Sequence, residues 1–467
     1  MEFTNIVLWG TGIIGHRYYN ILNKMGITPV MFIDNNNEKH GTYIHGIKVC
    51  APVTLKENNN YTILIACKAS DEIYAQAVAL GVTSSNIYKM EETLGMLILH
   101  AIKTDIYNIS EKYDNEINRK SIIFDMQNGA ALGGVETWVL EQGEKLNEKG
   151  YSVACLLGNE YNTQLEMPTS FELIYANKTD DLCDQIEKNI ENLILYHGGI
   201  VVSNFASYNM FSNCYYKRIN KDVRHIMVIH SDDDIYYQMV MILGTYIDYC
   251  IVVSEKIKKK LMNFGFDKRK IRVINWNVEV DESYRKMNFN NIIRIGYAGR
   301  VTTLAKRLDY IPEIVEQLNR NGVKYIFQIA GVGDYYDELS DYIKKNDLND
   351  KVVLLGIVDK SKIKDFWREQ DIYFSCSDWE GHSISQCEGI AYGAVPVVTD
   401  VSGASDDICD GVNGYIVPVG DWKALADKIC YLSEHRDILK QMSDAGMDRM
   451  RERNKLYKNN VLEELCH

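Results

Sequence analysis

The sequence predicts an α/β protein built from three successive units of alternating strands and helices. The chain has 467 residues, about three times the length of a typical domain. Short apolar runs recur along it, and each is followed by a turn and a helical pattern; strands that alternate with helices in this way form parallel sheets. We expect a first unit at residues 1–90, a helical linker at 91–118, and two larger units at 119–285 and 286–467.

Composition and charge narrow the class of protein. Apolar residues make up 46% and charged residues 25% of the chain, the balance of an ordinary soluble globular protein. The formal charge is −13, so we expect no nucleic acid partner, because phosphate binding depends on a basic surface. The 11 cysteines include no C-x-x-C pair, which indicates thiols of a reducing compartment rather than a zinc site. Neither a signal peptide nor a membrane-spanning stretch is visible, so we expect a cytoplasmic protein.

The first unit carries a pattern typical of dinucleotide binding. An apolar run ends at Trp9 and leads into Gly10-x-Gly12-x-x-Gly15, and a second run ends at Asp34. In such a pattern the pyrophosphate lies on a helix start and the acid binds ribose hydroxyls. The unit is about half of a full dinucleotide-binding fold, so we expect no NAD requirement. The alternative to dinucleotide binding is a docking, oligomerisation or regulatory role, including a homo-oligomer.

The two larger units show the same strand–helix rhythm. The second begins at the apolar run 122–124, after a linker with one apolar patch and no strand signal. The third begins near residue 291, and its charged helical tail contains a last helix that is a candidate to cross back to the second unit. Further strands are expected at Ser152–Leu157, Ile200–Ser203, His225–Ile229, Tyr249–Val253, Tyr325–Ile329, Lys351–Leu355, Ile372–Ser375 and Val395–Thr399.

Cations and glycines follow the first strands of the third unit. Arg300 comes directly after a strand, and Lys306 lies shortly beyond it. Residues just past the carboxyl end of a parallel strand face the ligand crevice, and two cations there suit a diphosphate. The alternative is that Lys306 belongs to a solvated helical turn. Gly331 and Gly333 follow the next strand, where they either let the backbone approach a ligand or form a plain turn.

The most informative segment is Glu380-Gly-His-Ser-Ile-Ser-Gln-Cys-Glu388, between a strand and a helix. Amides at the helix start, at Ser383–Ser385, would point at an anion, which the helix dipole favours. Two carboxylates beside an anion are suited to sugar hydroxyls rather than to phosphate. The alternative is a capping box, Ser385-x-x-Glu388 or Ser383-x-x-Gln386. If Ser383 is the cap, Glu388 is free to face the cleft.

Together, the cation pair, the two spaced glutamates and the trailing sequence Ala391-Tyr-Gly-Ala-Val-Pro396 resemble the family 4 retaining glycosyltransferases of GT-B fold, also described as glycosyl transferases group 1. The resemblance covers about residues 120–450. It implies two Rossmann-like domains that face a cleft, preceded here by a small Rossmann-like unit. The C-terminal domain would bind a nucleotide-diphosphate sugar, and the N-terminal domain a glycan or lipid-linked acceptor in bacterial surface polysaccharide biosynthesis.

The resemblance also implies a role for each matching position. Arg300 and Lys306 would neutralise the departing diphosphate, Glu380 would bind donor-sugar hydroxyls, and Glu388 would bind the ribose. His230, at a strand end, would lie near the donor sugar, although a lone histidine there is more often structural. The remaining donor-binding and loop positions are Gly331, Gly333, Ser383, Ile384 and Ser385 for the donor, and Gly133 and Gly134 for a glycine-rich loop that approaches the phosphate or the acceptor, or else forms a tight turn.

The chemistry expected of this site is metal-independent hexosyl transfer. Fixed positive charge on the leaving diphosphate is the most direct help to such a reaction, and the cations and the helix start supply it. Retention of configuration follows from the resemblance alone. Departures from the family pattern at His382, at Gly389 and in residues 402–407 leave the donor open. The alternative functions are a catalytically silent nucleotide-sugar sensor and an NAD-dependent redox or epimerase activity of the first unit.

Two further patterns compete with this interpretation. Asp232-Asp-Asp234 has the spacing of a metal-binding D-x-D, but a capped helix start is the favoured interpretation. Residues 255–272 contain eight basic and two acidic side chains, and we call them the basic cluster. A solvated helix face is the default for such a cluster; the alternative is peripheral contact with an anionic membrane.

Overall fold

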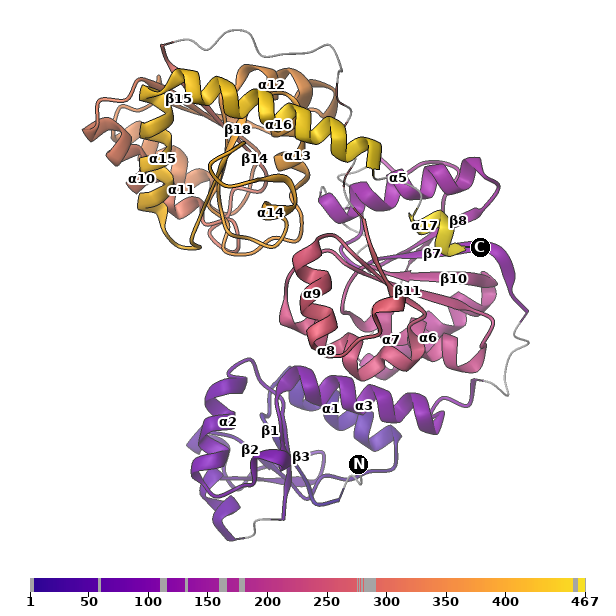
Figure 1. Ribbon diagram of the computed structural model, residues 1–467. Coiled ribbons are helices and arrows are strands. Elements are labelled where there is room, and N and C mark those ends of the chain that lie inside the picture. The colour runs from indigo at the N-terminus through magenta and orange to yellow at the C-terminus, as the bar shows by residue number, and fades with distance from the viewer. Residues whose placement is uncertain are drawn as a thin grey trace.

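The computed structural model has three α/β units in chain order (Figure 1). It describes residues 4–57, 60–109, 116–130, 133–158, 166–175, 181–274, 276, 278, 280, 291–456 and 461–466. We call the three units the N-terminal module, the middle lobe and the C-terminal lobe, and their sheets have six, seven and six strands. The predicted α/β class is confirmed, since the ladders of the two lobes are parallel.

The N-terminal module contains a small sheet with the strand order β3-β4-β2-β1-β5-β6. Its β3 strand pairs antiparallel with β4, because His45 and Gly46 both have positive φ and so form the two-residue turn of a hairpin. Its strands and helices are β1 (Ile6–Trp9), α1 (Ile13–Lys24), β2 (Met31–Ile33), β3 (Tyr43–Ile44), β4 (Ile47–Cys50), β5 (Thr62–Ile65), α2 (Ser70–Ala79), β6 (Ile87–Tyr88) and α3 (Met90–Thr104).

Helix α3 joins the module to the middle lobe by packing rather than as a free connection. Leu97, Ile98 and Ile102 on α3 belong to a core cluster that also holds Met239 and Leu243 of the middle lobe. Residues 110–115 of the expected linker lie outside the described residues. The module and the middle lobe therefore share one apolar core.

The middle lobe has the strand order β13-β12-β11-β10-β7-β8-β9. Its central strand β10 is buried along its whole length, because helices cover both faces of a parallel sheet. Its elements are β7 (Asn118–Met126), α5 (Gly134–Glu148), β8 (Ser152–Leu157), β9 (Glu172–Tyr175), α6 (Leu182–Leu195), β10 (Gly198–Ser203), α7 (Tyr208–Ile219), β11 (Arg224–Ile229), α8 (Asp234–Leu243), β12 (Tyr249–Val252), α9 (Glu255–Asn263) and β13 (Ile271–Val273).

The C-terminal lobe has the strand order β16-β15-β14-β17-β18-β19. Its elements are β14 (Ile293–Ala298), α10 (Ile311–Arg320), β15 (Tyr325–Ala330), α11 (Tyr336–Lys345), β16 (Val352–Gly356), α12 (Ile363–Glu369), β17 (Ile372–Ser375), α13 (Ile384–Ala391), β18 (Val395–Thr399), α14 (Ala404–Asp407), β19 (Tyr415–Val417), α15 (Trp422–Glu434) and α16 (Arg436–Leu456). The last helix, α17 (Val461–Cys466), returns to the middle lobe, where Leu462 and Leu465 join the core (Figure 1).

Both lobes reverse their strand order beside their first strand. The middle lobe does so between β7 and β10, and the C-terminal lobe between β14 and β17. Ligands of parallel α/β sheets bind at such switch points, beyond the carboxyl ends of the strands. The fold therefore places the loops after these four strands at the two crevices. No described helix is both long enough and apolar enough to cross a membrane.

Candidate functional site

The two lobes touch at their crevices. A Cβ atom at Gly381 would lie 1.8 Å from the carbonyl oxygen of His230, so only glycine fits this crossing. Nearby, Ser254 Oγ and Ser402 Oγ are 3.0 Å apart, and the amide of Glu255 donates to Asp406 at 3.0 Å. The segment that contains Glu380 therefore lies against the segment that contains His230.

Lys306 and Glu380 form an ion pair with each other, across the switch point of the C-terminal lobe. The same carboxylate oxygen, Oε1 of Glu380, also accepts a hydrogen bond from Ser377 Oγ at 2.9 Å. Both members of the ion pair are largely buried, whereas Arg300 is exposed. The structure thus joins two of the predicted site residues directly and leaves the third at the rim.

The loop that carries Lys306 is strained and anchored. Ala305 and Arg307 both have positive φ, which non-glycine residues adopt only when their surroundings hold them there. Arg307 pairs with Asp309 and with Asp378, each at 2.9 Å. From the sequence, Arg307 was expected at most in a solvated turn with Lys306, and Asp378 had no expected role, since only the adjacency of β14 and β17 brings the two together.

Helix α13 begins at the crevice with Ser383 as its cap. Ser383 Oγ accepts from the amide of Gln386 at 3.3 Å and lies 3.1 Å from the Tyr373 hydroxyl. Of the two capping alternatives, the structure adopts the one with Ser383, which leaves Glu388 out of the cap. Glu388 instead accepts from Trp367 Nε1 at 3.4 Å, and its burial raises its pKa to about 7.

The glycines after β15 are required by packing. A Cβ atom at Gly331 would lie 1.9 Å from the carbonyl oxygen of Gly299, and one at Gly333 would lie 2.1 Å from that of Val301. The loops after β14 and β15 therefore cross at van der Waals distance. This supports the plain-turn interpretation of the two glycines, and it keeps the Arg300 loop close to the sheet.

His230 stands at the end of β11 and is hydrogen-bonded to Asn204. Its Nε2 lies 2.9 Å from Asn204 Oδ1, while Asn204 Nδ2 donates to the carbonyl of Asp125 at 2.9 Å. The ring packs edge-on against Trp138, and burial lowers the pKa of His230 to about 3. His230 is therefore a neutral imidazole at pH 7. Asn204 follows β10 as His230 follows β11, and that strand-end position was its signal in the sequence.

The glycine-rich turn after β7 brings the middle lobe against α13. Gly133 caps α5 without a side chain, and a Cβ atom at Gly134 would lie 3.7 Å from Ile384 Cδ1. The carboxylate of Glu136 lies over Gly133, where a Cβ atom would be 2.5 Å from Oε2. The starts of α5 and α13 thus face each other across the contact between the lobes.

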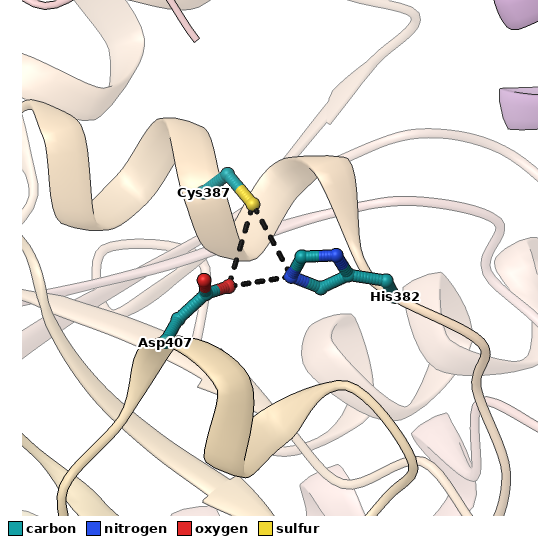
Figure 2. Close-up of side chains that lie close together, drawn as sticks. All are labelled: His382, Cys387 and Asp407. Atoms are coloured by element: carbon teal, nitrogen blue, oxygen red, sulfur yellow. Dashed lines mark hydrogen bonds and ion pairs between the residues drawn. The ribbon is translucent and has the colours of Figure 1, made fainter. Parts of the chain in front are cut away.

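A buried charged cluster supports α13 from behind (Figure 2). His382 Nε2 lies 2.7 Å and Cys387 Sγ 3.4 Å from Asp407 Oδ2. The other Asp407 oxygen pairs with Arg453, which also donates to the carbonyl of Trp276. Burial opposes ionisation, but His382 and Arg453 hold the pKa of Asp407 well below its usual range, and Asp407 raises the pKa of His382.

The donor atoms of this cluster are close enough to hold a metal ion, since all lie within 4.8 Å of one another. The chemistry of the set argues for an ion-pair network instead. Two cationic side chains already neutralise Asp407, and Gln386 Nε2 also donates to it at 2.9 Å. A divalent cation held by these donor atoms would lie close to the guanidinium group of Arg453, which would repel it.

The acids of the D-x-D pattern act at the start of α8. Asp233 Oδ1 accepts from the amide of Ile235 at 3.1 Å, as the capping interpretation predicts. Asp232 and Asp234 both pair with Lys260, at 3.1 and 2.9 Å.

In the N-terminal module, Gly10 has φ +126°, and a Cβ atom at Gly15 would lie 2.1 Å from the carbonyl oxygen of Gly10. The space around Gly12 is open. Asp34 pairs with Lys39 at 3.1 Å and also accepts from Thr11. Two of the three glycines are therefore explained by packing, and the acid of the pattern already has a cationic partner.

Two family models match separate parts of this chain. Residues 282–449 match the family described as "Glycosyl transferases group 1", and residues 2–88 match "C2185-like, N-terminal". The chain therefore carries a glycosyl transferases group 1 domain in its C-terminal lobe.

Curated relatives agree with this assignment. The amylovoran biosynthesis glycosyltransferase AmsK of Erwinia amylovora is 28% identical over 219 residues, which are 45% of this chain and 52% of that protein. The capsular polysaccharide biosynthesis glycosyltransferase CapM of Staphylococcus aureus is 26% identical over 232 residues, 46% of this chain and 59% of that protein. The chain thus spans about half the length of these relatives.

A solved structure confirms the architecture. Anabaena HepE in complex with UDP-glucose superimposes with a TM-score of 0.57 at 14% identity, over 72% of this chain and 97% of that chain. At this identity the match shows the fold alone. The expected GT-B arrangement of two Rossmann-like domains is thereby confirmed for the middle and C-terminal lobes.

Proposed function

We propose that the protein transfers a sugar from a nucleotide-diphosphate sugar to a glycan or lipid-linked glycan in surface polysaccharide biosynthesis. The observation that carries the proposal is the Lys306–Glu380 pair beside the start of α13, opposite His230 of the other lobe. The names of AmsK and CapM support the reaction class, and the complex of HepE supports UDP-glucose as a first donor to test.

The proposed site holds the donor from the C-terminal lobe. Lys306 and Arg300 supply cations for the diphosphate, and the amides that follow Ser383 supply the partial positive charge of a helix start. Lys306 and Glu380 neutralise each other in this structure, so donor binding gives each of them a new partner. The diphosphate binds the lysine, and sugar hydroxyls bind the carboxylate. Glu388, behind the helix start, is the proposed ribose ligand.

Catalysis in this proposal rests on the leaving group. Breaking the glycosidic bond to the diphosphate builds negative charge on it, and preorganised positive charge stabilises that state most. His230 is neutral at pH 7, so it contributes hydrogen bonding and shape rather than charge. We infer retention of configuration from the resemblance of the motifs alone. We infer metal independence from the same resemblance, and because the cations and the helix start can themselves stabilise the charge of the diphosphate.

The direct test is a panel of nucleotide sugars that includes UDP-glucose. We expect one of them to raise the melting temperature of the protein and to release its nucleoside diphosphate in the presence of an acceptor sugar, with EDTA present throughout. Binding without any turnover across acceptors would favour a nucleotide-sugar sensor. If no nucleotide sugar of the panel binds and none is turned over, the proposal is contradicted.

A further inference from the structure

Glu136 is a buried acid that the proposed donor site does not use. Its side chain is 4% exposed, and its Oε1 atom has no hydrogen-bond partner among the described residues. Buried polar atoms in folded proteins are almost always paired, so one that is not calls for an explanation. The structure of the middle lobe alone does not supply a partner.

The position of this carboxylate is fixed by the start of α5. It accepts hydrogen bonds from its own backbone amide and from the side chain of Asn128, and burial raises its pKa in spite of them. A glutamate in the first turn commonly satisfies helix-start amides in this way. That role engages one carboxylate oxygen and leaves Oε1, which is itself buried, without a hydrogen-bond partner among the described residues.

The residue that carries this unpaired oxygen lies close to the contact between the two lobes. Arg300 of the C-terminal lobe is near enough for its charge to favour the ionised form of Glu136. The neighbouring Gly134 approaches Ile384 at the start of α13. Glu136 therefore belongs to the middle lobe's side of the crevice that the proposed donor site occupies.

Resting on the proposed function, we infer that Glu136 Oε1 binds a hydroxyl group of the acceptor. A carboxylate repels the diphosphate, so its ligand is a hydrogen-bond donor, and a sugar hydroxyl makes a short, charge-assisted bond to it. The donor sugar already has Glu380 on the opposite lobe. The acid of the middle lobe thus serves the other substrate, and its role is binding, with no proton or covalent transfer.

The test separates acceptor binding from the helix-start role. Glu136→Gln keeps the size of the side chain and an oxygen for the helix amides, but removes the charge. Glu92 offers a matched control, because its carboxylate accepts from the amide of Lys89 at the start of α3 at 3.1 Å, far from the crevice. Glu92→Gln should leave all kinetic constants within twofold of wild type.

The probes are UDP-glucose as donor and, as acceptors, the methyl α-glycosides of glucose, galactose and N-acetylglucosamine. For Glu136→Gln we expect kcat/KM for the acceptor to fall at least tenfold, while the affinity for UDP-glucose and its slow hydrolysis by water stay within twofold. The inference is overturned if kcat/KM for the acceptor is unchanged in Glu136→Gln, or if its affinity for UDP-glucose falls in parallel. It is also overturned if the wild type hydrolyses UDP-glucose but glycosylates none of the three acceptors. A wild type that does not bind UDP-glucose contradicts the proposed donor instead.

Discussion

At the scale of single residues, the central feature is that the predicted donor ligands are partners of each other. Lys306 and Glu380 come from loops after different strands, and they pair because β14 and β17 are neighbours in the sheet. The positions of both residues could be predicted from the sequence, since each follows an apolar run. Their pairing could not, because it depends on strand order. The same holds for Asn204 beside His230 and for Arg453 beside Asp407.

Glu388 gives a pH-dependent prediction at this scale. Burial raises its pKa from 4.5 to about 7, so the folded protein holds this proton more tightly than the unfolded chain does. That contribution to stability is complete below about pH 4.5 and is lost as the pH rises through 7, by about 3 kcal/mol in all. Glu388→Gln, which stays neutral, should lack this loss.

Urea unfolding of wild type and Glu388→Gln at pH 5 and pH 8 measures the effect. We expect the free energy of unfolding of wild type to fall relative to the variant between the two values. If the free energy of unfolding depends on pH identically in the two proteins, Glu388 is ionised in the folded wild type at both pH 5 and pH 8.

At the scale of elements, most central strands and helix starts were predictable, whereas most edge strands were not. The expected runs at residues 200–203, 372–375 and 395–399 match β10, β17 and β18, since buried parallel strands read as continuous apolar runs. The edge strands β3, β9, β13 and β19 were missed because they are short and only partly buried, whereas the edge strand β16 matches the expected run at residues 351–355. The cap of α13 was ambiguous because Ser383 and Ser385 both precede a suitable partner.

Gly381 tests the approach of the two lobes. Its substitution by alanine would place a Cβ atom 1.8 Å from the His230 carbonyl, so the crevice would be held open. We expect Gly381→Ala to lower sugar transfer more than tenfold while the protein stays folded. Gly12→Ala is the control, since no atom lies within 4 Å of its Cβ position. Full activity of Gly381→Ala would mean that this lobe contact is not needed for transfer.

At the scale of the whole molecule, α3 packs the module onto the middle lobe, and α17, which follows the C-terminal lobe in the chain, packs on the middle lobe as well. That the sequence contains three α/β units was predictable from the strand–helix rhythm. How they join was not, because the apolar faces of α3 and α17 find their partners only in the folded chain.

The basic cluster carries a prediction about the membrane. Lys256, Lys258 and Lys260 pair with acids, but Lys259 has no ion pair among the described residues, and Phe264 nearby is 48% exposed. We propose that this face contacts anionic lipid, since cations beside an exposed aromatic side chain suit an interface. Lys259→Glu combined with Phe264→Ser should lower sedimentation with phosphatidylglycerol vesicles severalfold, whereas Lys345→Glu on α11 should not. Equal sedimentation of both variants would remove the proposal.

The most direct test of the proposed donor site is the rate of sugar transfer from the donor that the panel identifies, compared between wild type, Lys306→Ala and Lys188→Ala. Lys188 also forms an ion pair, with Glu191 at 3.0 Å, but both residues belong to α6 of the middle lobe. If Lys306 stabilises the departing diphosphate, its loss lowers kcat well over tenfold, and Lys188→Ala remains near wild type. A folded Lys306→Ala variant with the wild-type kcat would contradict the account.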